Sequence, residues 1–426
     1  MTTTRMSMHS QAAVQAQAHP DRARQALRTI AERDDELRAF AWRADPATLG
    51  AACPGPLSGM AFGVKDVIDV AGMPTGCGAE AADMSAKVFD AACVAQLRAA
   101  GAVPVGKTVT AEFAHMAPGP TRNPRRPTHT PGGSSSGSAA AVAAGMVDLA
   151  LGTQTGGSII RPAAFCGVVG YKPTFGRVHR AGMQVLCDTL DTIGWFTRSV
   201  EETIAVASVL MPRPGNARQD GRGPRVAVLP CASLGRLSPA AQTAMDHCIE
   251  VLQSLGATIL RPGLDADIDT LVGVHGRVMR YEFARGMLPI VQARAAGVTA
   301  QTAETVREGL AIGYDEYVRQ QHLRAALAAR WLDALADVDF IVSPSAPGEA
   351  PQGLASTGSS IFNRIWSLLG WPCLHLPTAT GELGLPVGVQ WIGRPDHDAE
   401  LLGWAAALHP ALDRRAGQDR GRAMRG

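Results

Sequence analysis

The segment GGSSSGS, residues 132–138, holds the residues whose types and spacing most directly suggest chemistry. Three interpretations compete for it. It could be a flexible Gly/Ser linker, a rigid loop that holds one catalytic serine, or a hydrolase nucleophile elbow, since Gly133 to Gly137 fits G-x-S-x-G around Ser135. A linker is disfavoured because the segment runs straight into AAAVAAG, which predicts a closely packed helix rather than a domain edge.

The elbow interpretation fails on its surroundings. A nucleophile elbow turns from a strand directly into a helix. The preceding NPRRPTHTPG contains three prolines and cannot form a central strand. The histidine partner would have to lie downstream, and His375 in CLHLP sits in an apolar run typical of a core histidine. The rigid loop is the interpretation that remains.

A second pattern, GAVPVGKT at residues 101–108, matches the P-loop motif G-x-x-x-x-G-K-[ST]. A P-loop needs a strand before its first glycine and a helix after its lysine, so that backbone N–H groups converge on phosphate. Here a predicted helix ends at Gly101 and the supposed loop is itself a Val-rich segment with a proline. Nucleotide binding is therefore kept only as an unfavoured alternative from another functional class.

The elements around these segments predict how they are positioned. Predicted helices cover 21–43, 90–101, 138–145, 238–256 and most of 266–336, and predicted strands cover 59–75, 102–108, 224–229, 257–260, 338–347 and 386–393. Residues 118–133 carry five prolines and predict a structured loop. Helices alternating with strands indicate an α/β fold with one mixed sheet covered by helices on both faces. We expect one large domain at 21–410, a flexible N-terminus at 1–20 and an Arg-rich flexible tail at 411–426.

Composition narrows the functional class. The 426 residues are 46% hydrophobic and 18% charged, with a formal net charge of +2, which gives no general attraction to nucleic acid or anionic membrane. The N-terminus lacks the apolar stretch of a signal peptide, and no run approaches the ~18 apolar residues of a membrane-spanning helix. Eight scattered cysteines without a CxxC pair argue against a zinc site or a disulfide scaffold. These features predict a cytoplasmic protein with reduced thiols.

Three segments together resemble the amidase signature family: GPLSGMAFGVKDVIDVAGMPT, GPTRNPRRPTHTPGGSSSGSAAAVAAGMVDLALGTQTGGSIIRPAAFCGVVGYKPTFGRV and LDTIGWFTRSVEE. LPVGVQWIGRPDHDAELL is similar to that family's C-terminal strand and helix. The resemblance is strongest over about residues 55–210, continues over 338–405 and leaves the middle of the chain unplaced.

The resemblance implies a Ser–cis-Ser–Lys triad. Lys65 in GVKD matches the lysine, Ser134 matches the bridging serine that follows a cis peptide, and Ser158 in QTGGSII matches the nucleophile, 24 residues further on. The backbone N–H groups of Thr155, Gly156, Gly157 and Ser158 match the oxyanion hole. The implied reaction is hydrolysis of an amide-type C–N bond through an acyl-enzyme, with no cofactor and no metal.

The chemistry of these residue types is consistent with that role. An amide carbonyl is a poor electrophile, so the enzyme needs an activated hydroxyl and a proton for the leaving amine. A lysine acts as a base only if burial lowers its pKa from about 10.4. The apolar neighbours of Lys65 favour such burial, and strand alternation should direct Asp66 away from it.

The resemblance leaves the partners open in part. We expect a small-molecule amide, aryl-amide or carbamate-type substrate, no nucleic acid and no membrane, with a homodimer as the one assembly considered. The alternative is a glutamine-amidase (A-type) subunit of an amidotransferase, to which KPTFGRV is similar. The sequence shows no docking surface or ammonia channel, and the chain is rather short for that role.

The chain departs from the family pattern at three places. Gln154 stands where Asp is common, Ile160 stands where Arg is common with Arg161 next to it, and Ser136 replaces a Gly. We expect Gln154 to make a neutral hydrogen-bonded substitute behind the oxyanion turn and Arg161 to point elsewhere. We expect residues 266–370 to form the pocket for the acyl group. Within this range we interpret Phe362, Trp366 and Trp371 as core residues rather than site residues.

Overall fold

The computed structural model describes residues 22–49, 53–211 and 222–423, with side chains described only as far as residue 412 in the last helix. The helices are α1 (Arg22–Leu37), α2 (Ala92–Ala99), α3 (Ser136–Ala143), α4 (Ile160–Cys166), α5 (Val200–Leu210), α6 (Pro239–Ser254), α7 (Asp265–Arg294), α8 (Ala300–Leu310), α9 (Tyr314–Ala334), α10 (Arg364–Leu369) and α11 (Asp398–Ala423). The strands are β1 (Phe40–Arg43), β2 (Ala61–Lys65), β3 (Val103–Thr108), β4 (Leu149–Gln154), β5 (Val169–Lys172), β6 (Thr192–Thr197), β7 (Arg225–Val228), β8 (Thr258–Leu260), β9 (Phe340–Pro344), β10 (Cys373–Thr380) and β11 (Pro386–Ile392).

Within these residues the strands form a single 11-stranded sheet in the order β1-β3-β2-β4-β6-β5-β10-β11-β9-β7-β8. The pairing is mixed: β2 runs parallel to β3 and β4, the central pairs from β4 to β9 are antiparallel, and β9, β7 and β8 are parallel again. The predicted α/β domain with one mixed sheet is confirmed.

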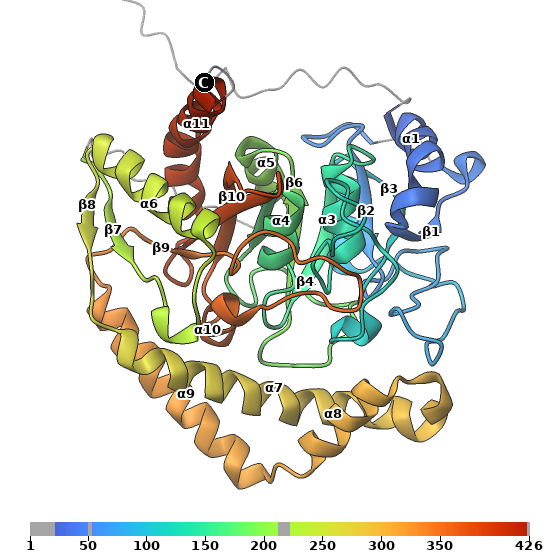
Figure 1. The fold of residues 1–426 in the computed structure, drawn as a ribbon. Coiled ribbons are helices and arrows are strands. Elements are labelled where there is room, and N and C mark those ends of the chain that lie inside the picture. Colours follow the sequence, from blue (N-terminus) through green and yellow to red (C-terminus); the bar gives the residue numbers. More distant parts are fainter. Residues whose placement is uncertain (1–21, 50–52, 212–221, 424–426) are drawn as a thin grey trace, which may run out of the picture.

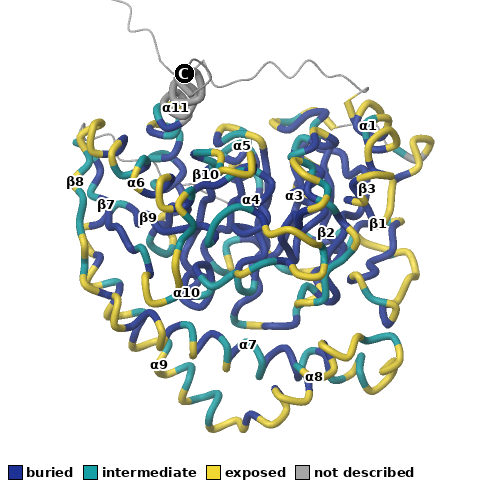
Figure 2. Tube along the Cα trace, in the orientation of Figure 1, coloured by how far each residue is buried: buried dark blue, intermediate teal, exposed yellow. Residues whose placement is uncertain are grey.

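Helices cover both faces of the sheet (Figure 1). On one face, α1, α3 and part of α4 pack against β2, β3 and β4 in a core rich in alanine and valine. On the other face, α2, α5, α6 and α11 contribute to the larger core with Trp195, Trp371 and Trp391. The central strands are buried, whereas most of the edge strands β1 and β8 and the outer sides of the helices are more exposed (Figure 2).

Helices α7, α8 and α9 form an additional layer across the sheet edge where β2 and β4 end (Figure 1). This position is confirmed by His275 of α7, which contacts the backbone just beyond β4. The outer side of this layer is largely exposed (Figure 2). The prediction that residues 266–336 are mostly helical is confirmed, and their place at the strand ends makes them a wall of any site there. None of the described helices is long and apolar enough to cross a membrane.

The predicted helix at 21–43 is wrong in its second half. Helix α1 ends at Leu37, and residues 40–43 form β1, which pairs antiparallel with β3. The helix stops because Arg38 adopts a left-handed conformation with φ 51°. The Asp34 side chain then accepts from the backbone N–H of Ala39 at 2.6 Å, which redirects the chain into the strand.

The predicted strand at 59–75 is also shorter than expected, because β2 ends at Lys65 and turns follow it. The predicted N-terminus, 1–20, lies outside the described residues. The predicted tail, 411–426, overlaps the end of α11, and residues 424–426 lie outside the described residues; its flexibility stays a prediction.

The P-loop alternative is contradicted by the backbone. Residues 103–108 form the buried strand β3, so Gly106 and Lys107 lie inside the sheet rather than at a helix N-terminus. Lys107 Nζ forms an ion pair with Asp66 Oδ1 at 2.9 Å and donates to Pro74 O at 2.8 Å. Its ammonium group is fully buried and has protein partners, which leaves no place for phosphate.

Candidate active site

Lys65 and Ser134 meet at the end of β2. The Lys65 Nζ atom donates to Ser134 Oγ at 2.8 Å and to Thr153 Oγ1 at 2.7 Å, and all three residues are buried. The peptide bond between Gly133 and Ser134 is cis, as the resemblance implies. Thr153 was not anticipated as a partner of the lysine. Its position two residues before the glycine turn Thr155–Ser158, in GTQTGGS, was the available signal.

The environment of Lys65 suits a base. Burial lowers its pKa from 10.5 to about 7, with Asp191 opposing this effect and Arg161 adding to it. Asp66 is the first residue after β2, and its carboxylate pairs with Lys107 rather than with Lys65. Near neutral pH a large fraction of Lys65 is therefore an uncharged amine.

The loop that carries Ser134 is held by Arg161 of α4. Its Nε donates to the carbonyl oxygen of Gly133 at 3.0 Å, and Nη1 donates to the carbonyl of Gly358. Gly133 has no room for a side chain, because a Cβ there would lie 2.6 Å from Thr357 Cγ2. Arg161 thus fixes the peptide that precedes Ser134, and its guanidinium bonds to this loop rather than to Gln154.

The neighbouring serines have structural roles. Ser135 Oγ donates to the carbonyl oxygen of Thr153 at 3.2 Å, and Ser136 Oγ donates to Val109 O at 3.3 Å. His375 is fully buried on β10 and bonds through Nδ1 to Ser345 Oγ at 2.7 Å. The elbow interpretation is therefore wrong, and His375 is the core histidine that the sequence indicated.

Ser158 lies in the glycine turn between β4 and α4 and is 7% exposed. Gln154 supports this turn from behind: its Oε1 accepts from the N–H groups of Ile159 at 2.8 Å and Ile160 at 3.1 Å. Its Nε2 donates to Ser367 Oγ at 3.0 Å, and Ser367 donates in turn to Gly156 O at 2.7 Å. Gln154 therefore provides the neutral hydrogen-bonded support expected of it.

The other side of the turn is fixed through Thr155. Its hydroxyl donates to Asp191 Oδ1 at 2.5 Å, and its carbonyl accepts from His275 Nε2 at 2.9 Å. Burial lowers the pKa of His275 to about 4, so the ring is neutral and carries its proton on Nε2. Neither Asp191 nor His275 was anticipated, because both reach the turn only through the fold.

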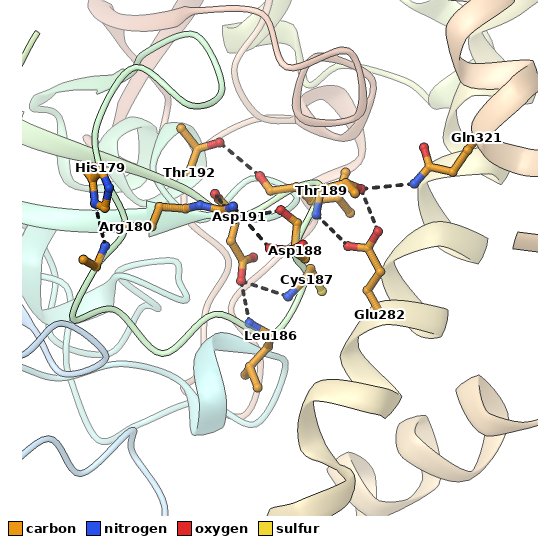
Figure 3. A network of polar contacts seen from close by, with 12 residues as sticks. His179, Arg180, Leu186, Cys187, Asp188, Thr189, Asp191, Thr192, Glu282 and Gln321 are labelled. Atoms are coloured by element: carbon orange, nitrogen blue, oxygen red, sulfur yellow. Dashed lines mark hydrogen bonds and ion pairs between the residues drawn. The ribbon is translucent and has the colours of Figure 1, made fainter. Parts of the chain in front are cut away.

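Asp191 belongs to a loop that contacts the helical layer (Figure 3). Its Oδ2 accepts from the backbone N–H groups of Leu186 at 2.9 Å and Cys187 at 3.0 Å. In the same loop, Thr189 Oγ1 donates to Glu282 Oε1 of α7 at 2.7 Å and accepts from Gln321 Nε2 of α9 at 3.3 Å (Figure 3). The loop 186–192 thus positions the glycine turn against α7 and α9.

A cavity of about 450 Å³ opens in front of Ser158. Its walls come from the glycine turn, from α7, from the segment before α10 and from segments near 113–116 and 183–187; they include Phe113, His115, Met183, His275, Met279, Phe283, Thr357, Ser360 and Arg364. The expectation that residues 266–370 form the pocket is therefore met in part, since two other segments contribute. Phe362, Trp366 and Trp371 are buried in the core, as predicted.

The structure brings the predicted residues to one place without showing every contact between them. Thr153, which bonds to Lys65, and Ser158 line the same cavity. Within the described residues no hydrogen bond joins Ser134 Oγ to Ser158 Oγ, so proton relay between the serines stays a prediction. No group of three His, Cys, Asp or Glu side chains in the described ranges could hold a metal ion.

The chain is similar to known proteins of one family over most of its length. The profile of the Amidase family matches residues 13–402. The A-type subunit of glutamyl-tRNA(Gln) amidotransferase from Synechococcus sp. (strain RCC307) is 32% identical over 91% of this chain and 93% of that protein. The solved A-type subunit from Thermotoga maritima is 28% identical, with a TM-score of 0.76 over 90% of this chain and 89% of that one. A chain of the inhibitor-bound form of a protein complex that reveals the evolutionary origins of an s-triazine catabolic enzyme is 27% identical, with a TM-score of 0.81 over 94% of this chain and 95% of that one.

These relatives bear on two expectations. The A-type subunits match the alternative of an amidotransferase component better than a free-standing amidohydrolase. Because the match to one of them covers 93% of its length, the shortness of this chain is no argument against that alternative. Their name includes a tRNA, so the exclusion of nucleic acid has no support. On family profile, fold and relatives together, this chain is a member of the Amidase family, enzymes that act on the C–N bonds of amides.

Proposed function

We propose that this chain hydrolyses a small-molecule amide through an acyl-enzyme on Ser158. The observation that carries the proposal is a buried lysine with a pKa of about 7, hydrogen-bonded to Ser134, beside a glycine turn that presents Ser158 to a cavity. Each part supplies one need of acyl transfer: a base, a proton carrier, a nucleophile and a place for the substrate.

In the proposed reaction, neutral Lys65 accepts a proton from Ser134, which takes one from Ser158 as Ser158 Oγ bonds to the amide carbon. The C–N bond then breaks, and Ser134 returns a proton to the leaving amine. Water attacks the acyl-enzyme by the same route and releases a carboxylic acid. Thr153 Oγ1 orients the lysine toward Ser134, because it accepts the second hydrogen bond of Nζ.

The glycine turn is suited to stabilise the oxyanion. Gln154 occupies the N–H groups of Ile159 and Ile160, whereas within the described residues those of Thr155, Gly156, Gly157 and Ser158 donate to no protein acceptor. Free, pre-positioned N–H groups beside a nucleophile are the usual oxyanion site, and losing one such donor typically costs about 3 kcal/mol of transition-state stabilisation.

A second role for the same chemistry is glutamine hydrolysis as the A-type component of an amidotransferase. It is favoured by the A-type relatives, two of which are 32% and 34% identical to this chain. In that role the ammonia released at Ser158 would pass to a second active site on a partner protein. Glutaminase activity that appears only when partner proteins are added would support it.

We also propose a cytoplasmic location, since all eight cysteines are free thiols and seven of them are buried. Free thiols are typical of a reducing compartment.

The test is a hydrolysis panel of primary amides, aryl amides, peptide amides and carbamates. Wild type should release amine from at least one class, and Ser158→Ala should lose that activity by at least about a thousandfold. The matched control is Ser136→Ala, since this hydroxyl bonds only to the Val109 carbonyl. Full activity in Ser158→Ala would overturn the proposal.

A further inference from the structure

Arg364 is a cation of the active-site cavity without an anionic partner. It is the first residue of α10, it lines the cavity, and its side chain is partly buried. Within the described residues its guanidinium makes no ion pair and no hydrogen bond. Burial and the neighbouring Arg280 lower its pKa, and no acid is among the causes of this shift. A guanidinium nevertheless stays charged in proteins.

The other ionisable groups of the cavity leave that charge uncompensated. Arg161 uses its guanidinium on the carbonyls of Gly133 and Gly358. Burial lowers the pKa of both His115 and His275 to about 4, so both rings are neutral at pH 7. Asp191 is the only acid among the described lining residues, and its two oxygens already accept from Thr155, Leu186 and Cys187.

From this geometry we infer that the substrate is an amide whose acyl part carries a carboxylate, bound by Arg364. The inference rests on the proposed function, because it concerns the ligand of the same cavity. A guanidinium presents a planar fork of donors that matches a carboxylate in a bidentate pair. The natural substrate class is then a monoamide of a dicarboxylic acid.

The position of α10 implies a short spacer between the two ends of the substrate. Residues on both sides of Arg364 touch the glycine turn: Ser367 Oγ donates to Gly156 O at 2.7 Å, and a Cβ on Gly157 would lie 2.5 Å from Asn363 Oδ1. We therefore expect a spacer of only a few bonds between the bound carboxylate and the carbonyl that Ser158 attacks.

The same charges discriminate against an amino group. Glutamine would place its carboxylate at Arg364 but would bring an ammonium into a cavity whose one acid, among the described lining residues, already accepts hydrogen bonds from three protein donors. An ammonium without an anionic partner in a partly buried site with a net positive charge is unfavourable. We therefore expect glutaramate, which is glutamine without its amino group, to be the better substrate.

Four amides that share three carbons after the amide carbonyl test the inference: glutaramate, glutamine, γ-aminobutyramide and butyramide. They carry the carboxylate alone, both charges, the ammonium alone or neither. In wild type, kcat/KM should be highest for glutaramate. In Arg364→Gln the ratio of kcat/KM for glutaramate to that for butyramide should fall about 10- to 100-fold, mainly through KM. Arg364→Lys keeps the charge and loses the planar fork of donors, so its ratio should lie between that of wild type and that of Arg364→Gln.

The control variant is Arg277→Gln, which removes a cation of α7 that is 55% exposed, pairs with Glu316 and does not line the cavity. It should leave the ratio unchanged, which separates a specific contact from the general field of the helical layer.

The outcomes separate this inference from the proposed function. Hydrolysis that depends on Ser158 but is as fast for butyramide as for glutaramate overturns the inference alone, and so does a preference for glutamine over glutaramate. If no amide is cleaved, the proposed function fails, and calorimetry with glutarate still decides the inference. Binding by wild type that is lost in Arg364→Gln supports the anion site, and equal binding or none overturns it. Thermal melting of each variant shows whether it is folded.

Discussion

Replacing Lys65 by Met tests the cause of its low pKa, because stability and activity should change in opposite directions. Burial lowers the pKa of this lysine from 10.5 to about 7. At 1.36 kcal/mol per pKa unit, the burial penalty on the charged form is roughly 5 kcal/mol. Met has a similar volume without the charge, so the variant removes this penalty and also removes the base. We expect Lys65→Met to be inactive, yet more stable than wild type at pH 6.

The stability of wild type should depend on pH because of Lys65. Because burial lowers the pKa, the unfolded chain binds one more proton than the folded chain between about pH 7 and about pH 10.4. The free energy of unfolding of wild type therefore rises with pH in that window, and below it the full penalty is present. Between pH 7 and pH 9 the gain from Lys65 is about 2 kcal/mol, and Lys65→Met should lack it.

Urea denaturation of the two proteins at pH 6, 7, 8 and 9 measures this difference. Other titrating groups occur in both proteins, so their contributions cancel when the two curves are subtracted. Lys87→Met is the matched control, since Lys87 is partly exposed and its stability curve should parallel that of wild type. Parallel curves for wild type and Lys65→Met would refute the neutralisation of this lysine by burial.

Two further predictions concern the residues that hold the site. Gln154→Asp should lower the free energy of unfolding by about 2–4 kcal/mol, seen as a lower Tm, and should lower kcat. The shorter carboxylate loses the hydrogen bond to Ser367 and buries a charge. An equal or higher Tm with full activity would contradict this. Lys107→Met should destabilise the fold by about 3–5 kcal/mol in urea denaturation, since it leaves Asp66 buried without its partner. Mg-ATP should not raise the Tm of wild type, and a clear rise would revive nucleotide binding.

Residues close in sequence to the Gly/Ser segment were predictable, because short motifs encode local geometry. Gln154 was expected to support the turn because it stands where the family pattern has Asp, and the contact is local, since Gln154 lies only a few residues from the N–H groups that it binds. The P-loop and elbow patterns were rejected correctly by asking which elements flank them. The helix error at 38–43 arose from one side chain, Asp34, whose hydrogen bonds outweigh the helical periodicity.

The residues that were missed reach the site from distant parts of the chain. His275 contacts a carbonyl 120 positions earlier, and Ser367 contacts one 211 positions earlier. Such contacts depend on how the strands are ordered and on where the helical layer lies, and no local pattern encodes either. Arg364 lies in a segment whose aromatic residues indicated core, and only the fold shows that its own side chain lines the cavity.

The most direct test of acyl transfer to Ser158 is to identify the residue that carries the acyl group. Wild type mixed with a slowly hydrolysed aryl amide, quenched in acid during the first turnover and digested, should yield one peptide that carries the mass of the acyl group. We expect this modification on Ser158, with none in Ser158→Ala. An acyl group on Ser134 or Ser135 would contradict the mechanism. So would a burst of aryl amine release with no acyl group found on the protein.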